Sequence, residues 1–168
     1  MCGLPFSGKS TLSKAISEYL DIPRISFDET WIKIEKENKF IPGENAVEQW
    51  KYICNACEQE ATKLLQDGIS VVYDNLGTTK EQRNTLRKLA NAAKSESVVV
   101  YVDVSKEEVI KRREDNLINT VRAQVSDENF NNALKQFERP SDDEKVLVYN
   151  PNQDLESWLK KHKNVDRI

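Results

Sequence analysis

The sequence predicts an α/β protein in which parallel strands alternate with crossover helices. Three observations predict this class: apolar runs alternate with helical patterns, a glycine-rich loop opens the first helix, and aspartates follow two of the predicted strands. A length of 168 residues is typical of one compact domain. We therefore place a single domain at residues 1–168.

The first element is the glycine-rich loop. Residues Gly3 to Thr11 fit a pattern of two glycines five apart followed by lysine and serine. Glycines let backbone N–H groups turn inward where a β-carbon would obstruct, so this pattern builds a phosphate cradle. Lys9 would meet the β and γ phosphates, and Ser10 would meet Mg²⁺. The residues that we expect to bind the nucleotide are Gly3, Ser7, Gly8, Lys9, Ser10 and Thr11.

A helix is predicted from Lys9 to about Leu20, because Leu12, Ile16 and Leu20 recur at helical spacing. Only Met1 and Cys2 precede the loop, where this architecture requires a buried strand of about five residues. We therefore expect the first strand to be missing or truncated. We also expect the natural gene to extend upstream of Met1 by about four to six mostly β-branched apolar residues.

Strands and helices alternate along the rest of the chain. Strands are predicted at residues 23–27, 69–73, 97–103 and 145–149. Helices are predicted at residues 44–66, from 78 or 79 to about 94, from 105 through 116, and at 154–161, with a capping box of Ser105 and Glu108 opening the third. The polar stretch 116–127 is interpreted as a loop.

Two aspartates follow predicted strands, where open α/β sheets bind their ligands. Asp28 opens a segment of aromatic and charged residues, Trp31 to Phe40, and could take the proton from an attacking hydroxyl; the alternative is a solvated helix cap. Asp74 follows the hydrophobic run Val71-Val72-Tyr73. A run of this kind precedes the magnesium-supporting aspartate of phosphate-loop enzymes; the alternative is an aspartate that only begins a loop. We expect an acceptor to bind at about residues 29–50.

Composition limits the classes of function. The chain is 38% hydrophobic and 32% charged, with no apolar run that approaches a membrane span, so we expect a cytoplasmic protein without a membrane partner. A net charge of −3 makes nucleic acid a less favoured partner than a small molecule. Cys54 and Cys57 form a CxxC inside a helical pattern, which favours small helix residues over a metal or redox pair.

The chain resembles the small P-loop kinases of the polynucleotide-kinase-like and zeta-toxin-like group, over nearly its whole length. The most specific motif is Cys2 to Thr11. The looser motifs are Ser26-Phe27-Asp28-Glu29, Val72-Tyr73-Asp74-Asn75 with Arg83, Arg112-Arg113 with Arg122, and Phe137-Glu138-Arg139-Pro140 with Asp143-Glu144.

The resemblance implies a P-loop NTPase fold of the nucleoside-monophosphate-kinase-like kind. That fold has three layers, with a parallel sheet of order 2-3-1-4-5 between helices, and it binds ATP and Mg²⁺ in the loop. Asp28 matches the base for the acceptor hydroxyl, and Asp74 matches a residue near magnesium or the acceptor. Which of the two carboxylates is the base stays open at this point.

The resemblance also assigns roles to residues of the second half of the chain. Arg113 matches a helix arginine near the adenine or the phosphates, although Arg112 could take that place. Arg122 falls in a lid of about residues 112–127 and is the candidate arginine finger. Pro151 lies in the loop where the adenine often rests.

These observations predict an ATP-dependent kinase that phosphorylates a hydroxyl of a small-molecule acceptor, with Lys9, Asp28 and Arg122 as catalytic residues and Ser10 and Asp74 at the metal. A polynucleotide 5′-hydroxyl kinase is the first alternative. A non-catalytic nucleotide-binding domain or switch is the second. Asp74-Asn75-Leu76-Gly77 fits the Asp-x-x-Gly motif of a GTPase switch, but the guanine signature Asn-Lys-x-Asp is missing from the sequence. The sequence does not indicate an oligomeric state.

Overall fold

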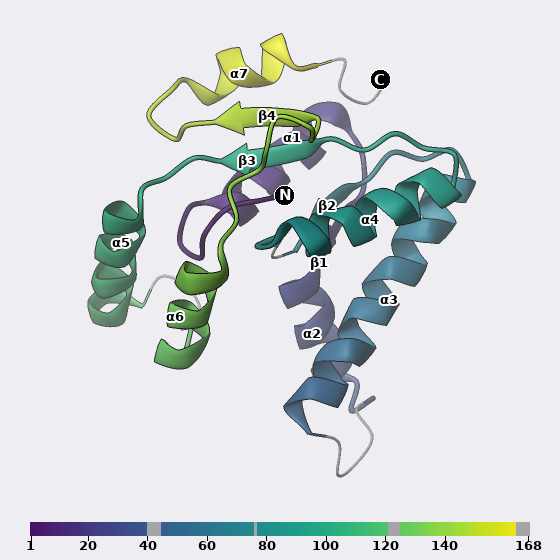
Figure 1. Ribbon diagram of the computed structural model, residues 1–168. Helices are drawn as coiled ribbons and strands as arrows, with labels where there is room; N and C mark the ends of the chain where they lie inside the picture. The colour runs from purple at the N-terminus through teal and green to yellow at the C-terminus, as the bar shows by residue number, and fades with distance from the viewer. Residues whose placement is uncertain (40–44, 76, 121–124, 164–168) are drawn as a thin grey trace.

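Parallel strands lie at the centre of the computed structural model, which describes residues 1–39, 45–75, 77–120 and 125–163 (Figure 1). Strands β1 (Arg24–Ser26) and β2 (Val72–Asp74) form one pair, and β3 (Val99–Val102) and β4 (Val146–Tyr149) form the other. The helices are α1 (Lys9–Leu20), α2 (Phe27–Lys36), α3 (Ala46–Gln66), α4 (Lys80–Ala92), α5 (Lys106–Asn119), α6 (Asp127–Gln136) and α7 (Leu155–Lys161).

Met1 and Cys2 join the two strand pairs. The Cys2 amide donates to the carbonyl of Val100 at 2.8 Å, and the Cys2 carbonyl accepts from the amide of Val102 at 2.9 Å. On the other side, the Met1 nitrogen donates to the carbonyl of Tyr73 at 2.8 Å. The order is therefore β1, β2, Met1–Cys2, β3, β4, all parallel where they pair. This confirms the predicted order 2-3-1-4-5, with Met1 and Cys2 in the place of the first strand.

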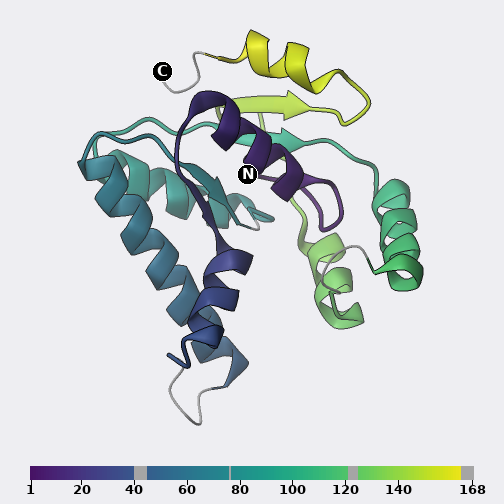
Figure 2. The ribbon, with the colours of Figure 1, turned by 180° about the vertical axis from the view of Figure 1, so that it is seen from behind.

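Helices cover both faces of the strands. Figures 1 and 2 show α1 on one face and α4 on the other. The face that bears α1 holds a buried cluster contributed by α1, α7 and three strands: Leu12, Ile16, Val72, Val102, Tyr149, Trp158 and Leu159. Since apolar helices lie on both faces, the central strands are buried on both sides, as in other parallel sheets.

Two smaller clusters fix the outer elements. One joins β1, α2 and α3 and consists of Ile25, Ile34, Ile53, Cys57 and Ala61. The other places the glycine-rich loop against α5 and α6 and consists of Leu4, Phe6, Val109 and Phe130. The loop is therefore held by apolar packing as well as by its own backbone turns.

Two helices differ from the sequence-based expectation. No helix was predicted between residues 27 and 36, yet α2 runs from Phe27 to Lys36. Ser26 caps it by accepting from the amide of Glu29, and acidic residues in its first turn favour the helix dipole. Helix α6 was not predicted at all; it is capped by Ser126 and held by the buried ring of Phe130.

The other elements were predicted correctly in type, with shifts at their ends. Strand β2 begins later than expected, at Val72, and helix α5 continues beyond residue 116 to Asn119. Ser105 accepts from the amide of Glu108, as the predicted cap requires. Helices α3 and α4 begin with reciprocal capping boxes, Asn45 with Glu48 and Thr79 with Gln82. Within the described residues, no helix is long and apolar enough to cross a membrane.

Cys54 and Cys57 lie on α3 as free thiols. Cys57 is fully buried in the α2–α3 cluster. Burial raises the pKa of both thiols, that of Cys54 to about 11, so both are protonated at neutral pH. The structure thus places this CxxC among helix packing residues.

A buried ion pair ties α4 to the segment before β4. The guanidinium of Arg83 donates to both carboxylate oxygens of Glu144, at 2.8 and 2.9 Å, and both side chains are almost fully buried. Arg83 also donates to the carbonyls of Gly77 and Glu138 and contacts the Cys2 sulfur at 3.8 Å. One cation therefore connects four separate parts of the chain.

We expect Glu144→Gln to destabilise the protein by about 3 to 5 kcal/mol, because it leaves the buried Arg83 without its charge partner. Arg83 lowers the pKa of Glu144 to about 2 from an ordinary value near 4.5. The contribution of this carboxylate is therefore complete above about pH 4.5 and is lost as the pH falls toward 2. Urea denaturation between pH 7 and pH 2 measures it.

Glu96→Gln is the matched control, since Glu96 forms an ion pair with Lys145 on the surface. Its unfolding free energy should stay close to that of the unmodified chain at every pH. Equal stabilities of the Glu144→Gln and Glu96→Gln variants would contradict the assigned role of the buried pair.

Candidate functional site

The glycine-rich loop turns sharply between Cys2 and α1. Gly3 has φ 145°, and a β-carbon there would lie 2.9 Å from the Ser7 hydroxyl and 3.0 Å from the Val102 carbonyl, so no larger residue fits. The Ser7 amide donates back to the Leu4 carbonyl at 3.2 Å, and Phe6 adopts a left-handed conformation. The loop is thus a tight turn packed directly on β3.

The loop leads into helix α1, whose N-terminus has no side-chain cap. Gly8 is the N-cap of α1, with φ 99° and no side-chain hydrogen bond to the first turn. The first amide bonded within the helix is that of Leu12, which donates to the Gly8 carbonyl at 3.0 Å. The amides of the preceding residues therefore have no acceptor within the helix, and together with the helix dipole they favour an anion.

Lys9 lies across the same loop. Its ammonium donates to the carbonyls of Gly3 and Leu4, at 2.9 Å each. The Ser7 hydroxyl, only 1% exposed, is buried without a hydrogen-bond partner within the described residues. Ser10 and Thr11 are exposed on the first turn of α1. An uncapped helix end, a lysine and hydroxyls are the donors that a polyphosphate with Mg²⁺ requires, so these residues fit the expected cofactors.

Asp74, at the end of β2, is bound by a buried arginine. Its Oδ2 accepts from Arg24 Nη2 at 2.6 Å and from the Ser13 hydroxyl at 2.7 Å. Burial alone would raise the pKa of Asp74, but the bonds from Ser13 and Arg24 lower it below its ordinary value. Asp74 is therefore a carboxylate at neutral pH, with one oxygen already occupied.

Arg24 joins three elements. Its Nε donates to the Ser13 hydroxyl of α1 at 2.7 Å, and its Nη1 pairs with Glu29 of α2 at 2.8 Å. Hydrogen bonding to Arg24 is the main cause of the lowered pKa of Glu29. The first turn of α2, which bears Asp28, is therefore fixed beside α1 and the end of β2.

Sequence reasoning missed Arg24 and Ser13. A charged residue between apolar residues of a short strand was the available signal, because a buried guanidinium requires an acidic partner. Ser13 lies one helical turn beyond Ser10, which places its hydroxyl on the side of α1 that meets the strands.

Asp28 differs from Asp74 in its surroundings. It is exposed in the first turn of α2, and within the described residues its carboxylate forms no ion pair or hydrogen bond. Next to it, the rings of Phe27 and Trp31 lie 6.0 Å apart between centroids, and those of Phe27 and Trp50 lie 6.2 Å apart. A free carboxylate therefore lies beside an aromatic cluster, from which Trp50 is 39% exposed.

The second half of the chain places Arg112 at the phosphate loop. Its guanidinium approaches the carbonyls of Phe6 and Ser7, at 3.5 and 3.3 Å, while pairing with Glu108. Arg113, the expected nucleotide contact, instead bonds to Asp127 and lies 4.7 Å from the centroid of the Phe130 ring. Its role at a nucleotide stays a prediction.

Arg122 and Pro151 are the remaining residues predicted for the site. Arg122 lies outside the described residues, together with Phe40 and Gly43 of the expected acceptor segment. Pro151 follows β4 in a turn where the Gln153 amide donates to the Asn150 carbonyl. This turn lies at the same edge of the strands as the phosphate loop (Figure 1).

Among the described residues, no group of three or more His, Cys, Asp or Glu side chains is arranged to hold a metal ion. A Mg²⁺ ion bound here would need phosphate oxygens and water among its ligands, as it commonly does in phosphoryl-transfer sites. Ser10 and Asp74 remain the predicted protein residues at that ion.

The sequence model of a family described as AAA domain matches residues 1–140, well over half of the chain. No curated protein is significantly similar to the chain in sequence. Kti12 from Chaetomium thermophilum, solved in complex with ADP-AlF3, has a similar structure, with a TM-score of 0.76 and 19% identity, covering 98% of this chain and 94% of that one.

Two kinases also have similar structures. The APS kinase CysC of Mycobacterium tuberculosis, in complex with AMPPNP and APS, has a TM-score of 0.68 and 16% identity, covering 99% of this chain and 95% of that one. A gluconokinase from Sinorhizobium meliloti has a TM-score of 0.63 and 18% identity, covering 99% and 89%. These similarities show a P-loop kinase-like fold, as the resemblance implied.

We expect Arg24→Gln to destabilise the protein by about 3 to 5 kcal/mol, because it leaves the buried Asp74 carboxylate without its cation. Lys160→Gln, which removes an exposed ion pair with Glu156, is the control and should have little effect. Urea midpoints of the two variants give the comparison. Equal midpoints would mean that the charge of Asp74 is stabilised in another way.

Proposed function

The chain belongs to this AAA domain family, and we propose that it is an ATP-dependent kinase that transfers the γ-phosphate to a hydroxyl of a small-molecule acceptor. One observation carries the proposal. The uncapped start of α1, with Lys9 across the loop, follows Cys2, and the exposed carboxylate of Asp28 follows β1, so both lie at the carboxyl ends of parallel strands. A phosphate cradle and a free base at one edge are what such a transfer requires.

The protein's part in this reaction is positioning and charge. The amides that open α1 would hold phosphate oxygens, and the Lys9 ammonium would exchange its loop carbonyls for the β and γ phosphates. Ser10 and Asp74 would hold Mg²⁺, which supplies charge neutralisation between the phosphates when it is bound. Arg112 is close enough to the loop to add a second positive charge there.

Asp28 would act as the general base. Its exposed carboxylate is free to accept the proton of an acceptor hydroxyl as that oxygen forms its bond to phosphorus. Asp74 is less suited to this role, because Arg24 and Ser13 already occupy one of its oxygens and lower its pKa. The cluster of Phe27, Trp31 and Trp50 would offer ring faces to the acceptor.

A nucleotide-binding protein without an acceptor is the second candidate. Kti12, a structural neighbour solved in complex with ADP-AlF3, is not named as a kinase. Such a protein would bind ATP but release ADP at a rate that no added hydroxyl compound changes. Measuring ADP release over a library of hydroxyl-bearing metabolites therefore separates the two candidates, with phosphorylated product identified by mass spectrometry.

Lys9→Ala should abolish transfer and weaken ATP binding by roughly 100-fold while the domain stays folded, because the partly exposed Lys9 side chain donates to loop carbonyls. Titration with a fluorescent ATP analogue, alongside circular dichroism, measures both properties. Lys14→Ala, an exposed lysine one turn and a half further along α1, is the control and should bind ATP normally. Full affinity and turnover in Lys9→Ala would make the loop motif a structural coincidence.

Asp28→Asn should lower turnover by about 10²- to 10⁴-fold while ATP affinity stays within a few-fold, because the amide keeps the shape but loses the basic lone pair. Glu35→Gln, an exposed carboxylate on the same helix, is the control and should be normal. Asp74→Asn should instead shift the Mg²⁺ concentration needed for nucleotide binding. Near-normal turnover in Asp28→Asn would leave Asp74 as the better candidate for the base.

A further inference from the structure

Phe6 has an unusual backbone conformation within the phosphate loop. Its φ is 65°, in the left-handed region, which a bulky side chain rarely adopts. This conformation costs free energy, and it persists only where the surrounding structure fixes it. Glycine adopts the same angle without that cost. The packing around Phe6 must therefore hold this turn in place.

The ring of Phe6 is buried between two helices from the second half of the chain. It is 7% exposed and packs in one cluster with the fully buried Val109 of α5 and with Phe130 of α6. The rings of Phe6 and Phe130 meet edge to face, with centroids 5.9 Å apart and an interplanar angle of 75°. Figures 1 and 2 show the loop close to α6. The side chain of Phe6 thus holds the loop against both helices.

The backbone of the loop is held at the same place. Arg112 of α5 directs its guanidinium to the carbonyls of Phe6 and Ser7, at 3.5 and 3.3 Å. The Ser7 amide donates to the Leu4 carbonyl at 3.2 Å, which closes the turn that contains Phe6. Gly8, the next residue, is the N-cap of α1. A shift of Phe6 would therefore move the amides at the start of α1.

Phe130 is itself fixed by contacts between α5 and α6. The guanidinium of Arg113 lies 4.7 Å from the centroid of the Phe130 ring. Arg113 also forms an ion pair with Asp127, in the first turn of α6. The two helices therefore form one support for the ring of Phe6.

We propose that Phe6 is a positioning residue for nucleotide and that Phe130 acts through it. The ring of Phe6, anchored by α6, keeps the loop in its strained turn before nucleotide arrives, so the loop does not have to be ordered when phosphate binds. Nucleotide affinity therefore depends on the packing of α6. This inference rests on the proposed binding of nucleotide at the loop.

A purely structural role for Phe6 would give a different order of variants. If the ring only filled the cluster, the damage would follow the size of the cavity, and glycine would be at least as damaging as alanine. If the ring holds a strained turn, alanine keeps the strain and loses the anchor, whereas glycine loses both. Alanine is then the more damaging replacement.

Calorimetric titration of the intact chain with ADP in the presence of Mg²⁺ tests this order. We expect Phe6→Ala to weaken ADP binding by about 30-fold and Phe6→Gly by only about 5-fold. Phe130→Leu should weaken it by about 5-fold in the unmodified chain but not in the Phe6→Gly background, where no ring remains to be held. Binding by Phe6→Gly that is no tighter than that by Phe6→Ala would overturn the proposal. The same effect of Phe130→Leu in both backgrounds would also overturn it.

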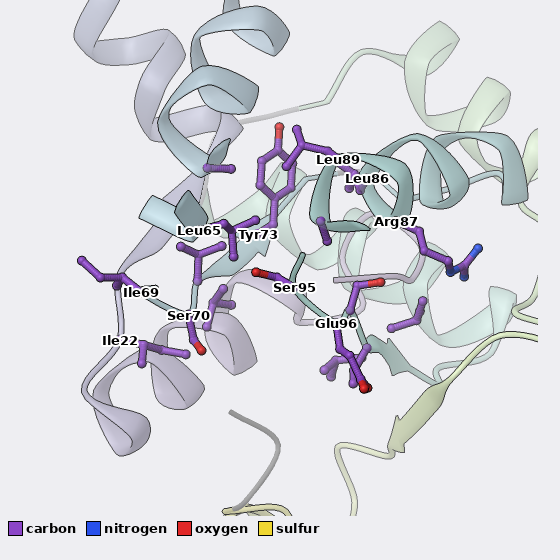
Figure 3. Close-up of a pocket in the computed structure, with 18 of the residues that line it drawn as sticks. Ile22, Leu65, Ile69, Ser70, Tyr73, Leu86, Arg87, Leu89, Ser95 and Glu96 are labelled. Atoms are coloured by element: carbon purple, nitrogen blue, oxygen red, sulfur yellow. The ribbon is translucent and has the colours of Figure 1, made fainter. Parts of the chain in front are cut away.

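Leu89→Ala is the matched control for loss of apolar packing. Leu89 lies on α4, where it packs against the α2–α3 cluster and lines a groove of about 430 Å³ (Figure 3). The variant should lower Tm but leave ADP affinity within about two-fold of that of the unmodified chain.

Amide hydrogen exchange of the nucleotide-free chain gives a second readout. The Ser7 amide, which closes the turn, should exchange about 10-fold faster in Phe6→Ala and Phe130→Leu than in the unmodified chain or in Leu89→Ala. Unchanged exchange at Ser7 would overturn the proposal whether or not ADP binds. Faster exchange in a chain that binds no ADP would instead count against the proposed function and support the anchoring of the loop by Phe6.

Discussion

Three backbone hydrogen bonds of Met1 and Cys2 hold the two halves of the sheet together, and the candidate site depends on them. The phosphate loop begins at the next residue and packs so closely on β3 that Gly3 has no space for a β-carbon. The position of the uncapped start of α1 is therefore set by a junction of two residues. Both halves of the sheet therefore fix the point at which the chain enters the loop.

The two aspartates of the candidate site have different electrostatic environments. Arg24 binds Asp74 and Glu29 together, so the end of β2 and the first turn of α2 share one cation. Asp28, adjacent to Glu29, has no ion pair or hydrogen bond to its carboxylate among the described residues, although its backbone is fixed by the same contact. Two aspartates that look alike in sequence thus have different chemistry, because one is buried and paired and the other is exposed.

The sequence predicted the parts of the fold that are determined locally. The loop motif, the long helix α3 and the valine-rich β3 have strong local signals, and the order of the strands followed from the family resemblance. Helix α6 was missed because a single buried ring, that of Phe130, holds it against the loop. The pairing of Arg24 with Asp74, 50 residues apart, and the approach of Arg112 to the loop depend on tertiary packing that no local pattern encodes.

Arg83 has a consequence for the order in which the chain folds. Its contacts reach residues 55, 61 and 81 positions away, at Glu138, Glu144 and Cys2. Contacts across such separations form only after long loops have closed, which makes them slow to assemble. We therefore expect the contacts of the guanidinium to form late in folding. Unfolding then requires all of these contacts to break. Interactions that form after the transition state retard unfolding more than they accelerate folding, so we expect the contacts of Arg83 to slow unfolding.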